Sequence, residues 1–188
     1  MKRYILFLPF LFFEMTTGYS QDKITATSEI SIKGTSNLHN WEVNSNLGSI
    51  NADMKINSGH VSAIKSLEVK VSVKTLKSSK GSVMDKKMYQ ALKADEFPYI
   101  TFNLLSVTKI LKTVWMDEII ATGYLEIAGI KKLIQLTVYA KTNAGQGTNF
   151  NLSKKIKMSD YGIEPPTALF GLLRTGNEID IGIKFSVK

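Results

Sequence analysis

The sequence contains no cysteine among its 188 residues. This absence excludes disulfide bonds, a thiol nucleophile, a CxxC redox pair and a cysteine-based zinc site. A chain of this length can still bury one sizeable hydrophobic core. We therefore expect a domain that packing and hydrogen bonds alone stabilise. The absence of disulfides therefore favours a large, well-closed sheet over a small cross-linked scaffold.

Arginine is almost as scarce, although the chain carries a net charge of +8. Arg3 and Arg174 are the only arginines, so lysine supplies nearly all of the positive charge. Surfaces that read nucleic-acid bases or clamp phosphates depend on arginine side chains. The lysines between residues 65 and 80 are scattered along expected strands, which is typical of a solvated outer face. The composition predicts no nucleic-acid partner and is compatible with transient contact with an anionic membrane surface.

Residues that could carry catalysis or bind a metal are also few. His39 and His60 are the only histidines, and no HExxH-like spacing is present. No glycine-rich phosphate loop opens a helix, and carboxylate pairs such as Asp95-Glu96 lie at element boundaries, where solvated acids are ordinary. Because no set of acid, base and nucleophile assembles, the sequence predicts a protein that is not an enzyme and that needs no metal or cofactor.

The first twenty residues differ in composition from the remainder. Two basic residues precede an apolar run over 5–13, and Gly18 and Ser20 supply the small residues of a cleavage site. The run is too short to span a bilayer, so residues 1–20 are expected to be a secretory signal peptide. Residues 21–188 would then form the mature domain, in a periplasm or outside the cell.

Alternation of apolar and polar residues dominates the remaining chain. Between residues 178 and 188, isoleucine, phenylalanine and valine occupy the odd positions almost without exception. A period of two is typical of a strand with one buried face. Similar runs begin near residues 24, 67, 100, 118, 132 and 149, with turn residues between them. Eight or nine antiparallel strands predict an all-β fold, and a closed barrel more readily than a sandwich.

Two segments interrupt this pattern with turn-forming residues. Residues 41–47 and 49–57 are expected to form a hairpin that turns near Gly48. The segment 161–176 contains two adjacent prolines and several glycines, which is too broken for a strand. We expect it to be a folded loop that packs over one end of the sheet.

Residues 82–93 change to a helical period before the middle strands begin. Met84 and Met88, with Ala91 and Leu92, would share one face of this single expected helix. Ser82 with Asp85 three residues later matches a capping box.

Four segments occur in a specific order: Met84–Tyr89 followed by Phe97–Phe102, the hairpin Gly123–Lys132, the step Asp160–Ile163 and the alternating last strand. Together they resemble the YceI-like family of exported bacterial proteins, over about residues 22–188. The resemblance implies an extended, lipocalin-like antiparallel barrel of about eight strands with one inserted helix. It also implies an interior that encloses the chain of a polyisoprenoid or similar amphipathic lipid.

The chain departs from the family pattern at three positions. Glu126 and Lys131 replace two threonines of the usual hairpin, and Met158 stands where many members carry an arginine. A headgroup contact through that arginine therefore does not carry over to this chain.

The residues on the apolar strand faces are the candidates for contact with a bound lipid. His39 and Trp41, two residues apart, would share a strand face and hold a polar headgroup at the mouth of the cavity. The other candidate lining residues are Ile100, Phe102, Leu104, Leu125, Ile127, Leu136, Val138, Ile181, Ile183 and Phe185.

The leading hypothesis is an exported protein that carries or stores an isoprenoid or quinone-like lipid in the cell envelope. The alternative is a non-enzymatic interaction module of the envelope, whose barrel is filled by its own side chains. The identity of the lipid and the oligomeric state stay open at this point, and a dimer is compatible with the sequence.

Overall fold

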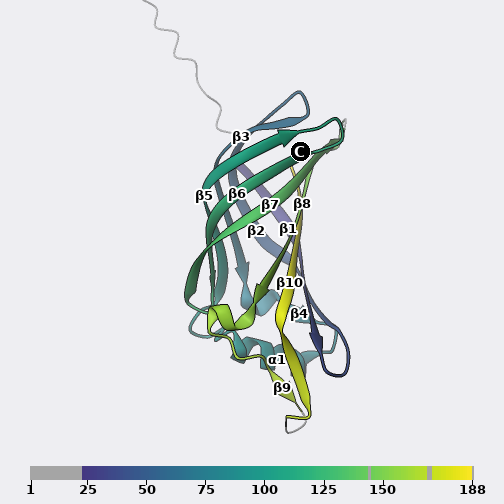
Figure 1. Ribbon diagram of the computed structural model, residues 1–188, viewed down its shortest axis with the longest axis vertical. Helices are drawn as coiled ribbons and strands as arrows, with labels where there is room; N and C mark the ends of the chain where they lie inside the picture. The colour runs from purple at the N-terminus through teal and green to yellow at the C-terminus, as the bar shows by residue number, and fades with distance from the viewer. Residues whose placement is uncertain (1–22, 144, 169–170, 188) are drawn as a thin grey trace, which may run out of the picture.

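The computed structural model describes residues 23–143, 145–168 and 171–187, so the expected signal peptide lies outside the described residues. Eight long strands form the body of the molecule (Figure 1). They are β1 Lys23–Ser36, β2 Trp41–Asn57, β3 His60–Ser72, β5 Tyr99–Lys112, β6 Asp117–Ile127, β7 Ile130–Asn143, β8 Gly147–Lys157 and β10 Leu173–Val187. The shorter elements are β4 Lys77–Ser78, β9 Thr167–Ala168, the α-helix α1 Ser82–Ala91 and the 3-10 turns η1 Val73–Thr75 and η2 Met158–Tyr161.

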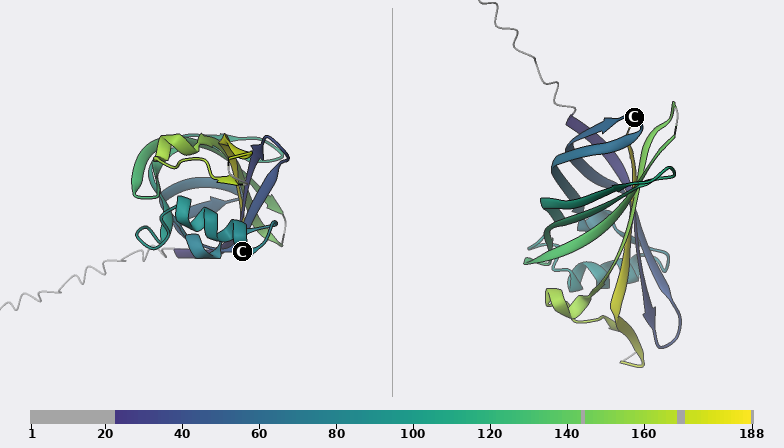
Figure 2. Two further views of the ribbon diagram at one scale, coloured as in Figure 1. Left: turned by 90° about the horizontal axis from the view of Figure 1, so that it is seen from below. Right: turned by 45° about the horizontal axis from the view of Figure 1, so that its top comes forward.

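The eight long strands close into a barrel. They are hydrogen-bonded in the order β1-β10-β8-β7-β6-β5-β3-β2, with every pair antiparallel. The last strand in this order, β2, also pairs with β1, which joins the two edges of the sheet. Figure 2 shows the strands surrounding a common interior when the barrel is viewed from below. The predicted all-β antiparallel barrel with one inserted helix is therefore confirmed.

The alternation that predicted the last strand is present in β10. Ile179, Ile183 and Phe185 belong to the hydrophobic interior or pack against it. The strand begins at Leu173, however, five residues before the expected start. Leu173 and Arg174 pair with Ala168 and Thr167 of β9, so part of the expected loop is a short β-ribbon.

The predicted hairpin at Gly48 is wrong, because β2 runs through this position as one strand. Between the pairs Ser28↔Gly48 and Ile30↔Ser45 the register shifts, which marks a β-bulge. A Cβ atom on Gly48 would lie 2.2 Å from the Ser28 Oγ atom. The glycine thus permits close approach of two strands, and the bulge produces the change of phase that resembles a turn in the sequence.

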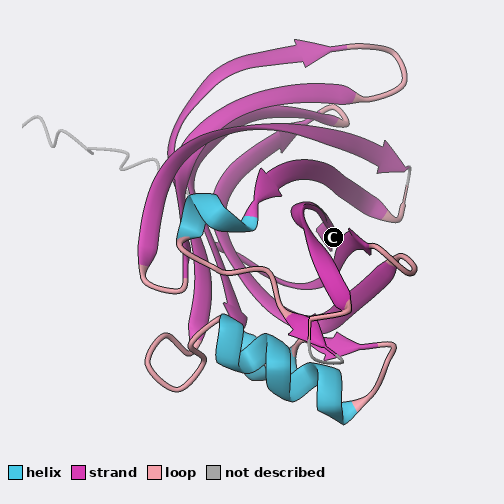
Figure 3. Cartoon of the chain, turned by 60° about the horizontal axis from the view of Figure 1, so that its bottom comes forward, coloured by secondary structure: helices cyan, strands magenta, loops and turns pink. Residues whose placement is uncertain are grey.

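One end of the barrel carries α1, η2 and β9 (Figure 3). The helix is confirmed, but it ends at Ala91 and its N-cap is Gly81, with Ser82 inside the first turn. The expected capping box is absent because the Asp85 side chain turns toward β4. Its Oδ1 atom accepts a hydrogen bond of 2.7 Å from the Ser78 amide. Asp85 therefore anchors the helix to the barrel.

The opposite end is fastened by a buried carboxylate at the start of β6. Asp117 accepts hydrogen bonds from the Val61 amide at 2.6 Å and pairs with His60 Nδ1 at 2.7 Å. These contacts tie the turn between β2 and β3 to β6. Within the described residues, no helix has the length and apolar character needed to cross a membrane.

Candidate functional site

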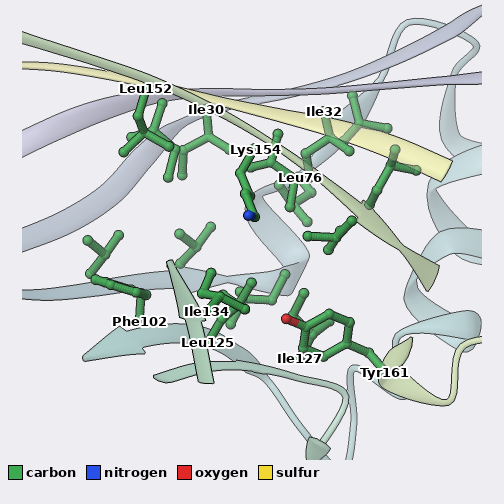
Figure 4. A pocket seen from close by; sticks show the side chains of 18 of the residues that line it. Ile30, Ile32, Leu76, Phe102, Leu125, Ile127, Ile134, Leu152, Lys154 and Tyr161 are labelled. Atoms are coloured by element: carbon green, nitrogen blue, oxygen red, sulfur yellow. The ribbon is translucent and has the colours of Figure 1, made fainter. Parts of the chain in front are cut away.

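The barrel encloses a cavity of about 210 Å³. One enclosed water molecule needs roughly 10–15 Å³ measured in the same way, so the space is far larger than a packing defect. Isoleucine, leucine, valine, methionine and phenylalanine side chains from all eight long strands supply most of the wall. Figure 4 shows these side chains directed into the cavity from several strands.

The structure brings eleven of the twelve predicted site residues to this cavity. They come from β2, β5, β6, β7 and β10. These residues are Trp41, Ile100, Phe102, Leu104, Leu125, Ile127, Leu136, Val138, Ile181, Ile183 and Phe185. The strand phase alone places them, because each lies on the inward face of its strand.

His39 does not line the cavity, and the expectation that it shares a strand face with Trp41 is wrong. It lies in the exposed turn between β1 and β2, before β2 begins. Its carbonyl oxygen accepts hydrogen bonds from the Ser36 amide at 3.1 Å and the Ser36 hydroxyl at 2.6 Å. The turn therefore removes His39 from the extended backbone that the prediction assumed.

Trp41 is held at the cavity by the strand beside it. A Cβ atom on Gly34, its cross-strand partner, would lie 2.2 Å from the indole ring, so the ring packs directly on this glycine. The indole Nε1 donates a hydrogen bond of 3.0 Å to the Thr35 carbonyl oxygen. The polar atom of Trp41 is thus occupied by the backbone, and its apolar ring faces the cavity.

Aromatic side chains shape the middle of the wall. The Phe102 ring covers Gly123, where a Cβ atom would come within 2.4 Å of it. Phe150 and Phe185 stack with ring centres 4.6 Å apart. In both arrangements a large ring packs against a neighbouring strand of the barrel wall. The rings therefore do not fill the centre of the cavity.

The cavity extends toward the end of the barrel that carries α1. Met84, Met88, Ala91 and Leu92, the predicted helix face, all contribute to its wall. Ser78, Lys87, Pro166 and Thr175 also line the cavity at this end. Toward the opposite end, inward side chains such as those of Val61 and Ala140 are buried and do not line the cavity.

Two polar side chains that the sequence analysis missed also face this apolar space. Lys154 lies on β8 in phase with Phe150, Leu152 and Ile156, and all four contribute to the cavity wall. Within the described ranges, no carboxylate forms an ion pair with its ammonium group. The sequence contains an indication of this arrangement, because Lys154 occupies the same strand face as apolar residues.

Tyr161 is the second such residue. Its side chain is only 2% exposed, and no protein group hydrogen-bonds its hydroxyl. Burial raises the pKa of this hydroxyl, and the negative charge of Asp160 raises it further. The hydroxyl therefore stays protonated and available as a donor at neutral pH.

Local backbone geometry explains why Tyr161 points inward. The turn η2 ends at Gly162, whose left-handed φ of 62° favours glycine. The Ile163 amide then donates to the Met158 carbonyl oxygen at 3.1 Å, which closes the turn. Tyr161 and Ile163 are both buried on either side of this glycine.

Over the described residues, the titratable side chains do not meet the requirements of a metal site. In the part of the chain that the structure describes, no group of three or more histidine, cysteine, aspartate or glutamate side chains lies close enough to hold a metal ion. The site that the fold provides is a largely apolar cavity, into which Lys154 and Tyr161 direct polar groups that have no protein partner among the described residues.

Solved structures with the same fold come from several bacteria. BcnA from Burkholderia cenocepacia is 17% identical, with a TM-score of 0.67, over 86% of this chain and 96% of the other. A polyisoprenoid-binding domain from Saccharophagus degradans, implicated in plant cell wall breakdown, is 10% identical, with a TM-score of 0.64, over 88% and 99%. The YceI protein of Campylobacter jejuni is 23% identical, with a TM-score of 0.53, over 74% and 81%.

The TM-scores show a common fold. At identities this low, the likeness carries no information about the ligand. No curated protein matches the sequence. The sequence itself matches the YceI-like domain over residues 19–187, which is nearly the whole chain. The protein is therefore a member of the YceI-like domain family.

Proposed function

We propose that this protein is an exported carrier that encloses the chain of an isoprenoid or similar amphipathic lipid, for transport or storage in the cell envelope. The apolar cavity of about 210 Å³ is the observation that carries this proposal. A structural relative is a polyisoprenoid-binding domain, which supports the same class of ligand. No catalytic chemistry is needed for this role.

Burial of hydrocarbon is a sufficient driving force for such binding. Each methylene group transferred from water to a dry apolar site contributes about 0.8 kcal/mol. A chain of several isoprene units therefore offsets the cost of ordering it, even without a charged contact. The closed hydrogen-bonded wall of the barrel also leaves the lining free of unpaired strand edges.

Native mass spectrometry of the protein purified from an exporting host tests the proposal. We expect a discrete bound mass that organic extraction removes and identifies as a lipid. Ala121→Leu should lower this occupancy, because Ala121 lines the cavity and the larger side chain would fill part of it. Thr122→Leu, on the outer face of the same strand, is the matched control. Protein without any extractable lipid would favour the alternative of a filled interaction module.

Export is the part of the proposal that rests on the first twenty residues. A basic start, an apolar run and small residues before Gln21 support cleavage after Ser20. The intact mass of the protein recovered from a periplasmic fraction should correspond to a chain that begins at Gln21. A full-length mass, or recovery from the cytoplasm alone, would contradict export.

Transient membrane contact would allow such a carrier to load and release lipid. The α1 end, which the cavity reaches, exposes Leu38 and Leu172, and the Asn37 side chain joins their two loops through a 2.8 Å hydrogen bond to the Leu172 carbonyl oxygen. Lys86 of α1 and Lys80, which lies just before this helix, are also exposed. We propose that this end approaches anionic lipid surfaces.

Sedimentation with phosphatidylglycerol vesicles tests this contact. Leu38→Ser combined with Leu172→Ser should reduce binding. Val114→Ser combined with Trp115→Ser removes exposed apolar groups from the turn between β5 and β6, beside Asp117 at the opposite end, and should leave vesicle binding unchanged. Equal losses in the two double variants would show that the α1 end has no special role.

A further inference from the structure

We propose that Lys154 and Tyr161 form a recognition site for a carboxylate headgroup inside the barrel. The inference rests on the proposed lipid-binding function and adds the chemical class of the headgroup. The ligand would be a single-chain amphiphile with a carboxylate at the end of its hydrocarbon tail, such as a long-chain fatty acid.

The first observation is the position of Lys154. Its neighbours on the inward face of β8 are Leu152 and Ile156, and its cross-strand partner is Ile181 of β10, which also lines the cavity. A half-buried ammonium group in such surroundings loses hydration, and within the described chain no carboxylate compensates its charge. A ligand that brings a negative charge would supply the missing partner.

The second observation is independent of the first and concerns a different element. Tyr161 reaches the cavity from η2, and its hydroxyl has no protein partner although the side chain is buried. Buried hydroxyl groups in proteins are normally hydrogen-bonded. Figure 4 shows the Lys154 nitrogen and the Tyr161 oxygen both directed into the cavity.

The charges of the two groups select a monoanion. One ammonium and one neutral hydroxyl offer a single positive charge and two kinds of donor, which suits the two oxygens of a carboxylate. A phosphate dianion would leave a second negative charge uncompensated among apolar side chains. Lys87, the other lysine of the lining, is engaged elsewhere, because its ammonium donates to the Thr167 carbonyl oxygen at 3.0 Å.

Direct binding measurements on extracted protein test this site. The chain has two tryptophans, and Trp115 is 77% exposed at a turn, so Trp115→Phe leaves Trp41 at the cavity as the only tryptophan. Oleate, methyl oleate and oleyl phosphate can then be titrated against Trp41 fluorescence in this background. Lys154→Met and Tyr161→Phe remove the two polar groups, and Lys155→Met and Tyr139→Phe change exposed residues of the same types as controls.

Lys154→Met should weaken oleate binding about tenfold or more, and Tyr161→Phe about two- to tenfold, since charged hydrogen bonds contribute more than neutral ones. Lys154→Met should weaken methyl oleate binding far less than oleate binding, because the ester carries no negative charge. An unchanged oleate affinity in Lys154→Met would overturn the site. Tighter binding of oleyl phosphate than of oleate would overturn the carboxylate assignment. If none of the three probes binds a parent protein that releases a lipid on extraction, the headgroup proposal alone fails. Absence of any extractable lipid contradicts the carrier function, so the two failures are distinguishable.

Discussion

At the scale of single residues, Tyr161 combines a cost to folding with a use in binding. A buried hydroxyl without a partner costs roughly 1–3 kcal/mol relative to a matched apolar group. Tyr161→Phe should therefore raise the free energy of unfolding of the lipid-free protein by about 1 kcal/mol, measured by urea denaturation. Tyr139→Phe, at an exposed position, should have no effect. A loss of stability in Tyr161→Phe would mean that the hydroxyl has a partner in the folded protein.

The same hydroxyl makes stability depend on pH in the alkaline range. Its folded-state pKa is raised above the usual 10.0 by burial and, to a smaller extent, by Asp160. The unfolded chain then loses this proton first, so the stability is complete below pH 10 and falls as the pH rises toward the folded pKa. The free energy of unfolding should decrease more steeply above pH 10 in the wild type than in Tyr161→Phe. Parallel curves would contradict the prediction.

Gly123 shows how a missing side chain shapes the cavity wall. A Cβ atom there would lie 2.4 Å from the Phe102 ring and 2.5 Å from the Asn103 carbonyl oxygen. Gly123→Ala should lower the free energy of unfolding by about 1–3 kcal/mol, because the ring and a backbone atom must both move. Gly182→Ala in β10 is the control, since its nearest atom would be 3.7 Å away. Equal effects of the two substitutions in thermal unfolding would refute this explanation.

At the scale of secondary-structure elements, the docking of α1 depends on one carboxylate. Asp85 accepts from the Ser78 amide and lies 3.7 Å from the Lys77 ammonium, whereas Ser82 contributes no side-chain cap. Asp85→Ala leaves the Ser78 amide without its acceptor and should cost about 1–3 kcal/mol of stability. Hydrogen exchange should also accelerate in β4 and α1. Asp95→Ala, which breaks an exposed pair with Lys74, should change neither quantity measurably.

The strands were predictable where the alternation was long and uninterrupted. The predicted lining residues of β6, β7 and β10 follow from a period of two, and all of them line the cavity. The rule failed at Gly48, because a bulge and a turn both shift the phase of the pattern and both favour glycine. Only the pairing with β1 distinguishes the two, and that contact is remote in the sequence.

The inward direction of Lys154 and Tyr161 also depends on tertiary contacts that the sequence pattern does not contain. Lys154 follows the phase of its strand, but lysine side chains are usually solvated, so the sequence alone does not predict its inward direction. Tyr161 lies in a turn, where no periodicity exists to assign a face. The prediction for His39 is wrong because β2 begins two residues later, at Trp41. The errors at His39 and Tyr161 thus lie where strand periodicity is absent, whereas Lys154 lies in an intact pattern and differs only in its residue type.

At the scale of the whole molecule, the contacts that hold the barrel closed are separate from the side chains that line the cavity. Closure through β1 and β2 satisfies the strand edges without any ligand, so the barrel does not need a filled interior to stay intact. The buried Asp117 pairs with His60 and Val61 at one end, while the cavity reaches the other end, under α1. An empty space can then persist because packing at the ends and the hydrogen-bonded wall maintain its shape.

A cavity of fixed size predicts how affinity depends on the length of the ligand. In a series of straight-chain fatty acids, each pair of added methylenes should contribute about 1.6 kcal/mol, or about fifteenfold in Kd, while the tail still enters the cavity. Once the tail is longer than the cavity, Kd should stay constant, because further methylenes remain in water. Titration against Trp41 fluorescence in the Trp115→Phe background would measure both regimes. Ala121→Leu should move the plateau to a shorter chain, since it fills space that the tail would occupy. Affinity that rises without a plateau, or that ignores chain length, would indicate binding at the outer surface of the barrel.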